Sequence, residues 1–268
     1  MNQAFSIRPL KTQTVNKACV GIYPSKSEMG KAAAFDAARL IREVISRKGH
    51  VRIIVATGNS QIDFVTELTH SQSLDWKCVE VFHMDEYVGI SGSCPASFAH
   101  WIKTRVADVV HPAHVHYLRG DSLDLGSEVR RYGALLDSDG IDLCFLGFGE
   151  NGHIAFNDPH CADFNDPLIL KRVTLDNKCR LQQVGEGHFP NLKAVPEEAI
   201  TLTCPTLMSA RNLICCVPER RKAEAVRNAL QGPLSSTCPA SLVVTHPRAK
   251  IYLDPESATL LNPLAVSQ

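Results

Sequence analysis

The chain has 268 residues, which is enough to bury the core of one large α/β domain or of two small ones. Lysine plus arginine and aspartate plus glutamate number 28 each, so the formal net charge is zero and nothing indicates binding to nucleic acid or to an anionic membrane. Residues 1–14 lack the apolar core of a signal peptide, and no apolar stretch approaches the roughly 18 residues of a membrane span, so the sequence predicts a soluble cytoplasmic protein.

The chain begins with a segment of weak pattern, and we interpret residues 1–16 as a loosely attached leader and residues 17–268 as the domain. The first strand is predicted at residues 18–23. An alanine-rich helix follows at residues 27–45, because its apolar residues recur at helical spacing after a serine cap.

A second strand is predicted at residues 51–56, and it ends in a small polar turn that contains Gly58, Asn59 and Ser60. A helix at residues 61–70 comes directly after the turn. Glycine lets the backbone approach a ligand, and the free amides at a helix start favour an anion. The turn is therefore suited to phosphate, although many α/β connections contain the same residues with no ligand.

The rest of the chain alternates between strand-like and helix-like patterns. Strands are predicted at residues 79–83, 141–146, 170–175, 199–203, 212–217 and 250–253, and helices at residues 95–106, 126–136 and 219–231. Repeated strand-then-helix order is typical of a parallel sheet covered by helices. The sequence thus predicts an α/β fold with a single domain, in which a mainly parallel, Rossmann-like sheet carries helices on both faces.

Residues 176–196 form a separate case, because Gly185, Gly187 and His188 lie there among polar neighbours. Such a segment is typical of a mobile active-site flap. An ordinary surface connection has the same pattern, and the sequence leaves both interpretations open.

Metal and disulfide sites are not predicted, although the chain has ten cysteines. No Cys-x-x-Cys pair occurs, and five of the ten cysteines lie in or beside apolar runs, which is typical of small buried residues in a reducing compartment. These five are Cys19, Cys78, Cys144, Cys215 and Cys216. The cluster of His111, His114 and His116 lacks a carboxylate or cysteine at ligand spacing, so we interpret it as a surface loop that enters a strand.

Two polar clusters come after apolar strands. Asp85 lies just beyond the strand at residues 79–83, and His153 and Asp158 follow the strand at residues 141–146 after a turn rich in glycine. The carboxyl ends of parallel strands line one crevice of an open sheet. We therefore expect the two clusters to meet at one ligand.

These clusters carry a resemblance to a known family. Met84-Asp85-Glu86-Tyr87, then Pro95-x-Ser97-Phe98, and the run Gly-Glu-Asn-Gly-His-Ile-Ala-Phe-Asn-Asp-Pro at residues 149–159 resemble the glucosamine-6-phosphate deaminase family, which shares a superfamily with the 6-phosphogluconolactonases. The resemblance covers residues 31–254. It implies a phosphorylated amino sugar as substrate, fructose 6-phosphate and ammonia as products, and no metal or organic cofactor; a homo-oligomer is compatible with it.

The resemblance also implies the roles of individual residues. His153 would open the sugar ring with its imidazole oriented by Asn151 and Asp158, and Asp85 would move a proton between carbons 2 and 1. The residues that it implies for substrate binding are Gly58, Asn59, Ser60, Glu86, Lys222 and Arg180.

Three positions depart from the family pattern. Asp158 stands where many members have glutamate, so its reach to the imidazole is expected to need a water or a shifted backbone, and Asn151 stands where some have aspartate. An arginine that several members use on the phosphate aligns near Gly185, so either Arg180 or Arg220 replaces it or the substrate differs.

Two other functions therefore stay open. A lactone hydrolase of the 6-phosphogluconolactonase type is one, although the segment at residues 156–159 is typical of the deaminases. The other is a regulator that binds a sugar phosphate and has lost turnover.

Overall fold

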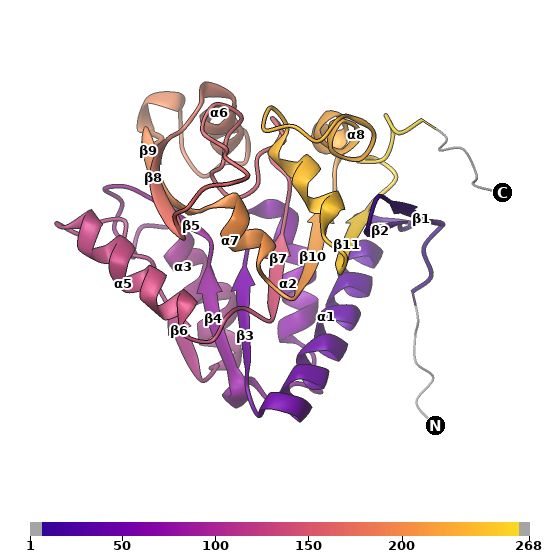
Figure 1. Ribbon diagram of the computed structural model, residues 1–268, viewed down its shortest axis with the longest axis horizontal. Coiled ribbons are helices and arrows are strands. Elements are labelled where there is room, and N and C mark those ends of the chain that lie inside the picture. Colours follow the sequence, from indigo (N-terminus) through magenta and orange to yellow (C-terminus); the bar gives the residue numbers. More distant parts are fainter. Residues whose placement is uncertain (1–6, 263–268) are drawn as a thin grey trace.

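An eight-stranded sheet forms the centre of the molecule in the computed structural model, which describes residues 7–262 (Figure 1). The strand order is β1-β2-β11-β10-β7-β3-β4-β6. These strands are β1 (Lys11–Val15), β2 (Ala18–Ile22), β3 (Val51–Val55), β4 (Val79–His83), β6 (His114–His116), β7 (Leu143–Leu146), β10 (Asn212–Val217) and β11 (Ala249–Leu253). The pair β1 and β2 runs antiparallel and the other neighbouring pairs run parallel, which confirms the predicted mainly parallel sheet.

Helices cover both faces of this sheet, as predicted (Figure 1). On one face, β3 contributes Val51, Ile53 and Val55 to a core that includes α1 and α2. On the other, Ile54 of β3 joins a core that includes α5, α7 and α8. The helices are α1 (Lys26–Lys48), α2 (Ile62–Thr69), α3 (Phe98–Ile102), α4 (Asp108–Val110), α5 (Leu125–Asp137), α6 (Asn177–Gly185), α7 (Cys204–Met208) and α8 (Ala223–Gln231).

The strands predicted at residues 170–175 and 199–203 exist, but they do not belong to the central sheet. They are β8 (Leu170–Thr174) and β9 (Glu198–Leu202), and with β5 (Asp85–Tyr87) they form a separate antiparallel sheet in the order β5-β9-β8. The expectation of one sheet is therefore corrected, because β5 turns away from the end of β4 and pairs with β9. This small sheet places Asp85 beside the carboxyl end of β4.

Two further segments differ from the sequence-based expectations. Strand β1 lies inside the segment interpreted as a leader and pairs along its length with β2, so that interpretation is corrected for residues 11–15; residues 1–6 lie outside the described part. Helix α6 occupies much of the 176–196 segment, which was expected to be a flap or a connection. The helices in residues 7–262 include none that is both long and apolar enough to cross a bilayer.

Candidate active site

A pocket opens at the carboxyl ends of β3, β4, β7 and β10, where the predicted clusters meet. The residues that line it are Ala56, Thr57, Gly58, Asn59, Ser60, Gln61, Met84, Asp85, Phe98, Gly147, Phe148, Gly149, His153, Ala155, Phe156, Gln182, Gln183, Glu186 and Lys222. Asp85 and His153 thus share one pocket with the turn after β3 and with Lys222. This is the convergence that the strand-end positions predicted.

The turn after β3 is held in a defined shape. Gly58 has a φ of 93°, a conformation that favours glycine, and a 3₁₀ turn at Asn59–Gln61 leads into α2. The side-chain amide of Gln61 donates to the carbonyl oxygens of Leu146 and Cys216, at 3.3 and 3.2 Å, and so ties the turn to β7 and β10.

Asp85 begins β5 and is 5 % exposed. Burial, and after it the nearby charge of Glu86, raise the pKa of Asp85 well above its usual value. Its backbone carbonyl accepts a hydrogen bond from Nδ1 of His83 at 2.9 Å, while Nε2 of that ring accepts from the amide of Leu118. Asp85 is thus a buried carboxyl whose backbone is fixed and whose side chain faces the pocket.

Glu86 has a different role from the predicted one. It does not line the pocket, and its carboxylate accepts hydrogen bonds from Ser97 Oγ at 2.6 Å and from the amides of Phe98 and Ala99 at 3.2 and 2.9 Å. Glu86 therefore caps the start of α3, and these contacts do not support its predicted contact with the substrate.

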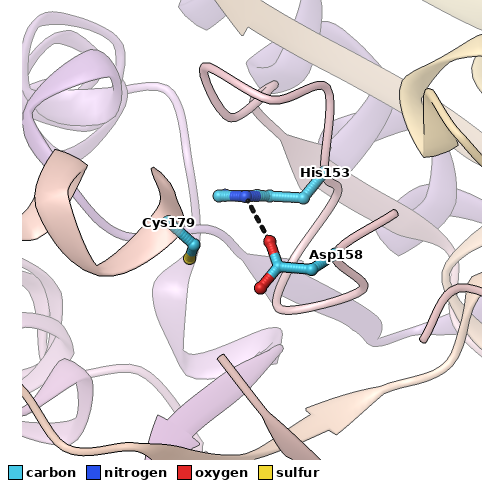
Figure 2. A group of neighbouring side chains, drawn as sticks. All are labelled: His153, Asp158 and Cys179. Atoms are coloured by element: carbon cyan, nitrogen blue, oxygen red, sulfur yellow. Dashed lines mark ion pairs between the residues drawn. The ribbon is translucent and has the colours of Figure 1, made fainter. Parts of the chain in front are cut away.

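His153 lies against Asp158 in the turn after β7 (Figure 2). Nδ1 of the ring is 3.1 Å from Oδ1 of Asp158, although the ring N–H is not aligned well enough for a hydrogen bond. Burial acts to raise the pKa of Asp158, but the nearby imidazole of His153 and hydrogen bonds from Asn151 Nδ2 and the backbone amide of Asp176 outweigh burial and leave that pKa below its usual value. The carboxylate therefore lies directly beside the imidazole, so the expectation of a bridging water is corrected.

Asn151 connects this pair to the backbone. Its side-chain oxygen accepts from the amide of His153 at 3.0 Å, and its Nδ2 donates to Asp158 Oδ1 and Asp176 Oδ2, both at 2.8 Å. Asn151 and Asp158 contact His153 without lining the pocket themselves, and their predicted role in orienting its ring remains a prediction.

Cys179 of α6 lies beside His153 and Asp158, to their left in Figure 2. Its thiol, His153 and Asp158 are close enough together to hold a metal ion, as are Asp158, His160 and Asp176. Burial raises the pKa of the Cys179 thiol well above its usual value. The absence of a metal therefore remains a prediction.

Lys222 follows β10 and is only 1 % exposed, yet it lines the pocket. Its ammonium makes no ion pair within 4.0 Å with any of residues 7–262. Burial lowers the pKa of Lys222 to about 8, while the charge of Glu186 acts in the opposite direction. A buried cation facing a pocket without a close partner is suited to an anionic ligand.

The two arginines expected to replace the family arginine lie elsewhere. Arg180 donates to the carbonyls of Leu192 and Val195, at 3.0 and 2.9 Å, and the side chain of Arg220 is 71 % exposed. Neither lines the pocket, so this geometry does not support the predicted contact of Arg180 with the substrate. The sequence analysis also missed Gln182, Gln183 and Glu186, which reach the pocket from α6 and its end.

Comparisons with known proteins agree with this geometry. The family described as glucosamine-6-phosphate isomerases/6-phosphogluconolactonase matches residues 24–253. The chain is 33% identical over 223 residues to a glucosamine-6-phosphate deaminase of Exiguobacterium sibiricum, covering 83% of this chain and 86% of the relative. It is 31% identical over 224 residues to a glucosamine-6-phosphate deaminase of Bacillus thuringiensis, covering 84% and 83%.

Solved structures show the same fold. A monomeric glucosamine-6-phosphate deaminase superposes with a TM-score of 0.82 at 30% identity, covering 90% of this chain and 99% of the other. A 6-phosphogluconolactonase from Shewanella baltica superposes with a TM-score of 0.72 at 16% identity, covering 90% and 97%. The second likeness concerns the fold alone.

Proposed function

Because this chain belongs to the glucosamine-6-phosphate isomerase/6-phosphogluconolactonase family, we propose that it isomerises and deaminates glucosamine 6-phosphate, or a close hexosamine phosphate, to fructose 6-phosphate and ammonia. One observation carries the proposal. A buried carboxyl, Asp85, and an oriented imidazole, His153, face the same pocket as the phosphate-type turn at residues 58–60 and the buried ammonium of Lys222.

The turn and Lys222 bind the phosphate. The turn offers backbone amides, and Lys222 supplies the fixed positive charge that phosphate needs. Phosphate bound at this end directs the sugar toward Asp85 and His153. Binding energy from the phosphate thereby positions the reacting carbons, which is how remote contacts contribute to rate.

His153 opens the sugar ring. A neutral imidazole accepts the proton from the hydroxyl at carbon 1 and returns it to the ring oxygen. The ionised Asp158 beside Nδ1 fixes the orientation and tautomer of the ring, and Asn151 holds both in place.

Asp85 then removes the proton from carbon 2 of the open aldehyde, and the aldehyde oxygen takes a proton from the substrate's ammonium group, which gives an enolamine. Asp85 delivers its proton to carbon 1, which gives an iminium at carbon 2, and water hydrolyses this iminium to fructose 6-phosphate and ammonium. Burial favours this step, because a carboxylate with a raised pKa is a stronger base once ionised. The ammonium group of the substrate supplies a positive charge that favours the ionised form.

The test is the release of ammonia together with fructose 6-phosphate from glucosamine 6-phosphate. We expect Asp85→Asn to lower kcat at least 10²-fold, while Kd for the substrate changes little, because the amide keeps the shape and cannot act as a base. Asp121→Asn, at an exposed turn, is the matched control and should keep full activity. Folded enzyme that forms neither product from several hexosamine phosphates would contradict the proposal.

Two other outcomes have a clear meaning. Release of acid from 6-phosphogluconolactone, at the same rate in Asp85→Asn as in the wild type, would favour the lactone hydrolase. That reaction needs no base to remove a proton from carbon. Tight binding of a hexosamine phosphate without turnover of either substrate would favour a regulator.

A further inference from the structure

A carboxylate occupies the phosphate end of the pocket. Glu186 follows the last residue of α6, and its side chain is 5 % exposed. Its Oε2 lies over Gly58, 3.5 Å from the place where a Cβ on that glycine would be. An acidic side chain in this position is unexpected, because the same turn and Lys222 are the groups suited to an anionic ligand.

Several contacts hold Glu186 there. Its Oε1 accepts hydrogen bonds from Nη1 of Arg221 at 2.6 Å and from the side-chain Nε2 of Gln182 at 2.8 Å. Its backbone carbonyl accepts from Asn59 Nδ2 at 3.1 Å, which joins the end of α6 to the turn itself. The hydrogen bond with Asn59 couples the position of Glu186 to the loop that would receive the phosphate.

The surrounding charges are balanced without a ligand. Arg221 pairs with Glu186, with Glu150 at 3.3 Å and with Glu219 at 2.6 Å. Glu219 also pairs with Lys26 at 2.7 Å. His188 Nε2 also lies 3.4 Å from Oε2 of Glu186, whereas the ammonium of Lys222 has no carboxylate within 4.0 Å among residues 7–262. Burial acts to raise the pKa of Glu186, but His188, Lys222 and Arg221 outweigh it and hold that pKa well below its usual value, so this carboxylate is ionised.

A phosphate that enters the pocket therefore meets a negative charge already in place. Two anions a few ångströms apart repel each other by about 1 kcal/mol in water and by several times more near a protein surface. Either the phosphate binds weakly or the end of α6 shifts and takes Glu186 away from the turn.

We propose that Glu186 is a specificity-determining residue that competes with the substrate's phosphate for the cationic groups of Lys222 and Arg221. The inference rests on the proposed function, because it assigns the phosphate to this end of the pocket. Glu186 weakens phosphate binding and keeps inorganic phosphate from filling the empty site. A complete substrate, which also has contacts at Asp85 and His153, overcomes the repulsion.

The experiment measures the binding of inorganic phosphate by isothermal titration calorimetry, which needs no turnover. Glu186→Gln removes the charge and keeps the shape, so we expect phosphate to bind roughly tenfold tighter or more. Glu150→Gln is the matched control, because Glu150 pairs with the same arginine but does not line the pocket; its phosphate affinity should stay within about twofold of wild type. If Glu186→Gln fails to fold, we expect Glu186→Ser to show the same increase in phosphate affinity.

Turnover then gives a second readout. KM for glucosamine 6-phosphate should fall in Glu186→Gln, and phosphate should become a stronger competitive inhibitor. Unchanged or weaker phosphate binding in both Glu186 variants would overturn the inference and would mean that the carboxylate serves as a substrate ligand. Tighter phosphate binding without ammonia release from any hexosamine phosphate would support the inference while contradicting the proposed function.

Discussion

Gly149 lies directly against the imidazole of His153. A Cβ at this position would stand 2.3 Å from Cε1 and Nε2 of the ring, a distance at which the ring must move. We expect Gly149→Ala to lower kcat by about 10²-fold, since a displacement of about 1 Å at a catalytic group has an effect of this size. Gly92→Ala is the control, because its Cβ meets nothing closer than 3.9 Å. Wild-type kcat in Gly149→Ala would contradict the role of His153.

The pKa of Lys222, lowered to about 8 by burial, sets the pH dependence of phosphate binding. The ammonium is the form that binds an anion, so affinity for phosphate should fall by up to tenfold per pH unit above this pKa. We expect inorganic phosphate to bind at least about tenfold more weakly at pH 9.5 than at pH 8, as measured by calorimetry. Lys222→Arg keeps its charge over this range and should give a flat profile, whereas a flat wild-type profile would contradict the assignment.

The sequence predicted those pocket residues that follow a strand within one short motif. Asp85, His153 and the turn at residues 58–60 line the pocket, because the end of a parallel strand fixes where the next residues lie. Lys222 lines it too, but it was predicted from the family resemblance alone. Glu186 could not be predicted in the same way. It comes to the turn through the end of α6, and nothing local in the sequence shows where that helix packs.

At the scale of elements, Glu86 links the small sheet to α3. Its two carboxylate oxygens accept from four donors, which are Ser97 Oγ and the amides of Tyr87, Phe98 and Ala99. Glu86→Gln replaces one acceptor oxygen by an amide nitrogen that faces donors, so we expect a loss of about 2–3 kcal/mol in the free energy of unfolding. Chemical denaturation measures this change in the free energy of unfolding. Glu256→Gln, at a side chain 61% exposed, should change stability by less than about 0.5 kcal/mol, and an equal effect of both variants would contradict the capping role.

The residue patterns predicted that most helices and strands exist, but they did not predict which strands pair with one another. β8 and β9 read as strands because they contain apolar and β-branched residues, yet pairing depends on contacts that a single strand does not encode. α6 was missed for another reason. Its buried residues are Cys179, Gln182 and Gln183, so it lacks the apolar stripe by which a helix is recognised.

At the scale of the whole molecule, β1 closes one edge of the central sheet. Its residues Lys-Thr-Gln-Thr-Val are mostly exposed, which explains why the sequence was interpreted as a leader. The strand nevertheless pairs residue by residue with β2, whose Ala18 and Val20 are fully buried. An edge strand of this kind shields the backbone donors and acceptors of its neighbour from other chains.

Deletion of residues 1–15 tests whether this edge stabilises the fold. The loss of β1 leaves the outer backbone groups of β2 without their partners, so we expect a loss of roughly 2 kcal/mol, or a Tm lower by about 4–8 °C, and a tendency to associate through the exposed edge. Activity at 25 °C should be kept, because the pocket lies at the ends of β3, β4, β7 and β10. Deletion of residues 1–8, which leaves β1 complete, is the control. If both deletions have the wild-type Tm and remain dispersed, residues 11–15 behave as the leader that their polar sequence suggested.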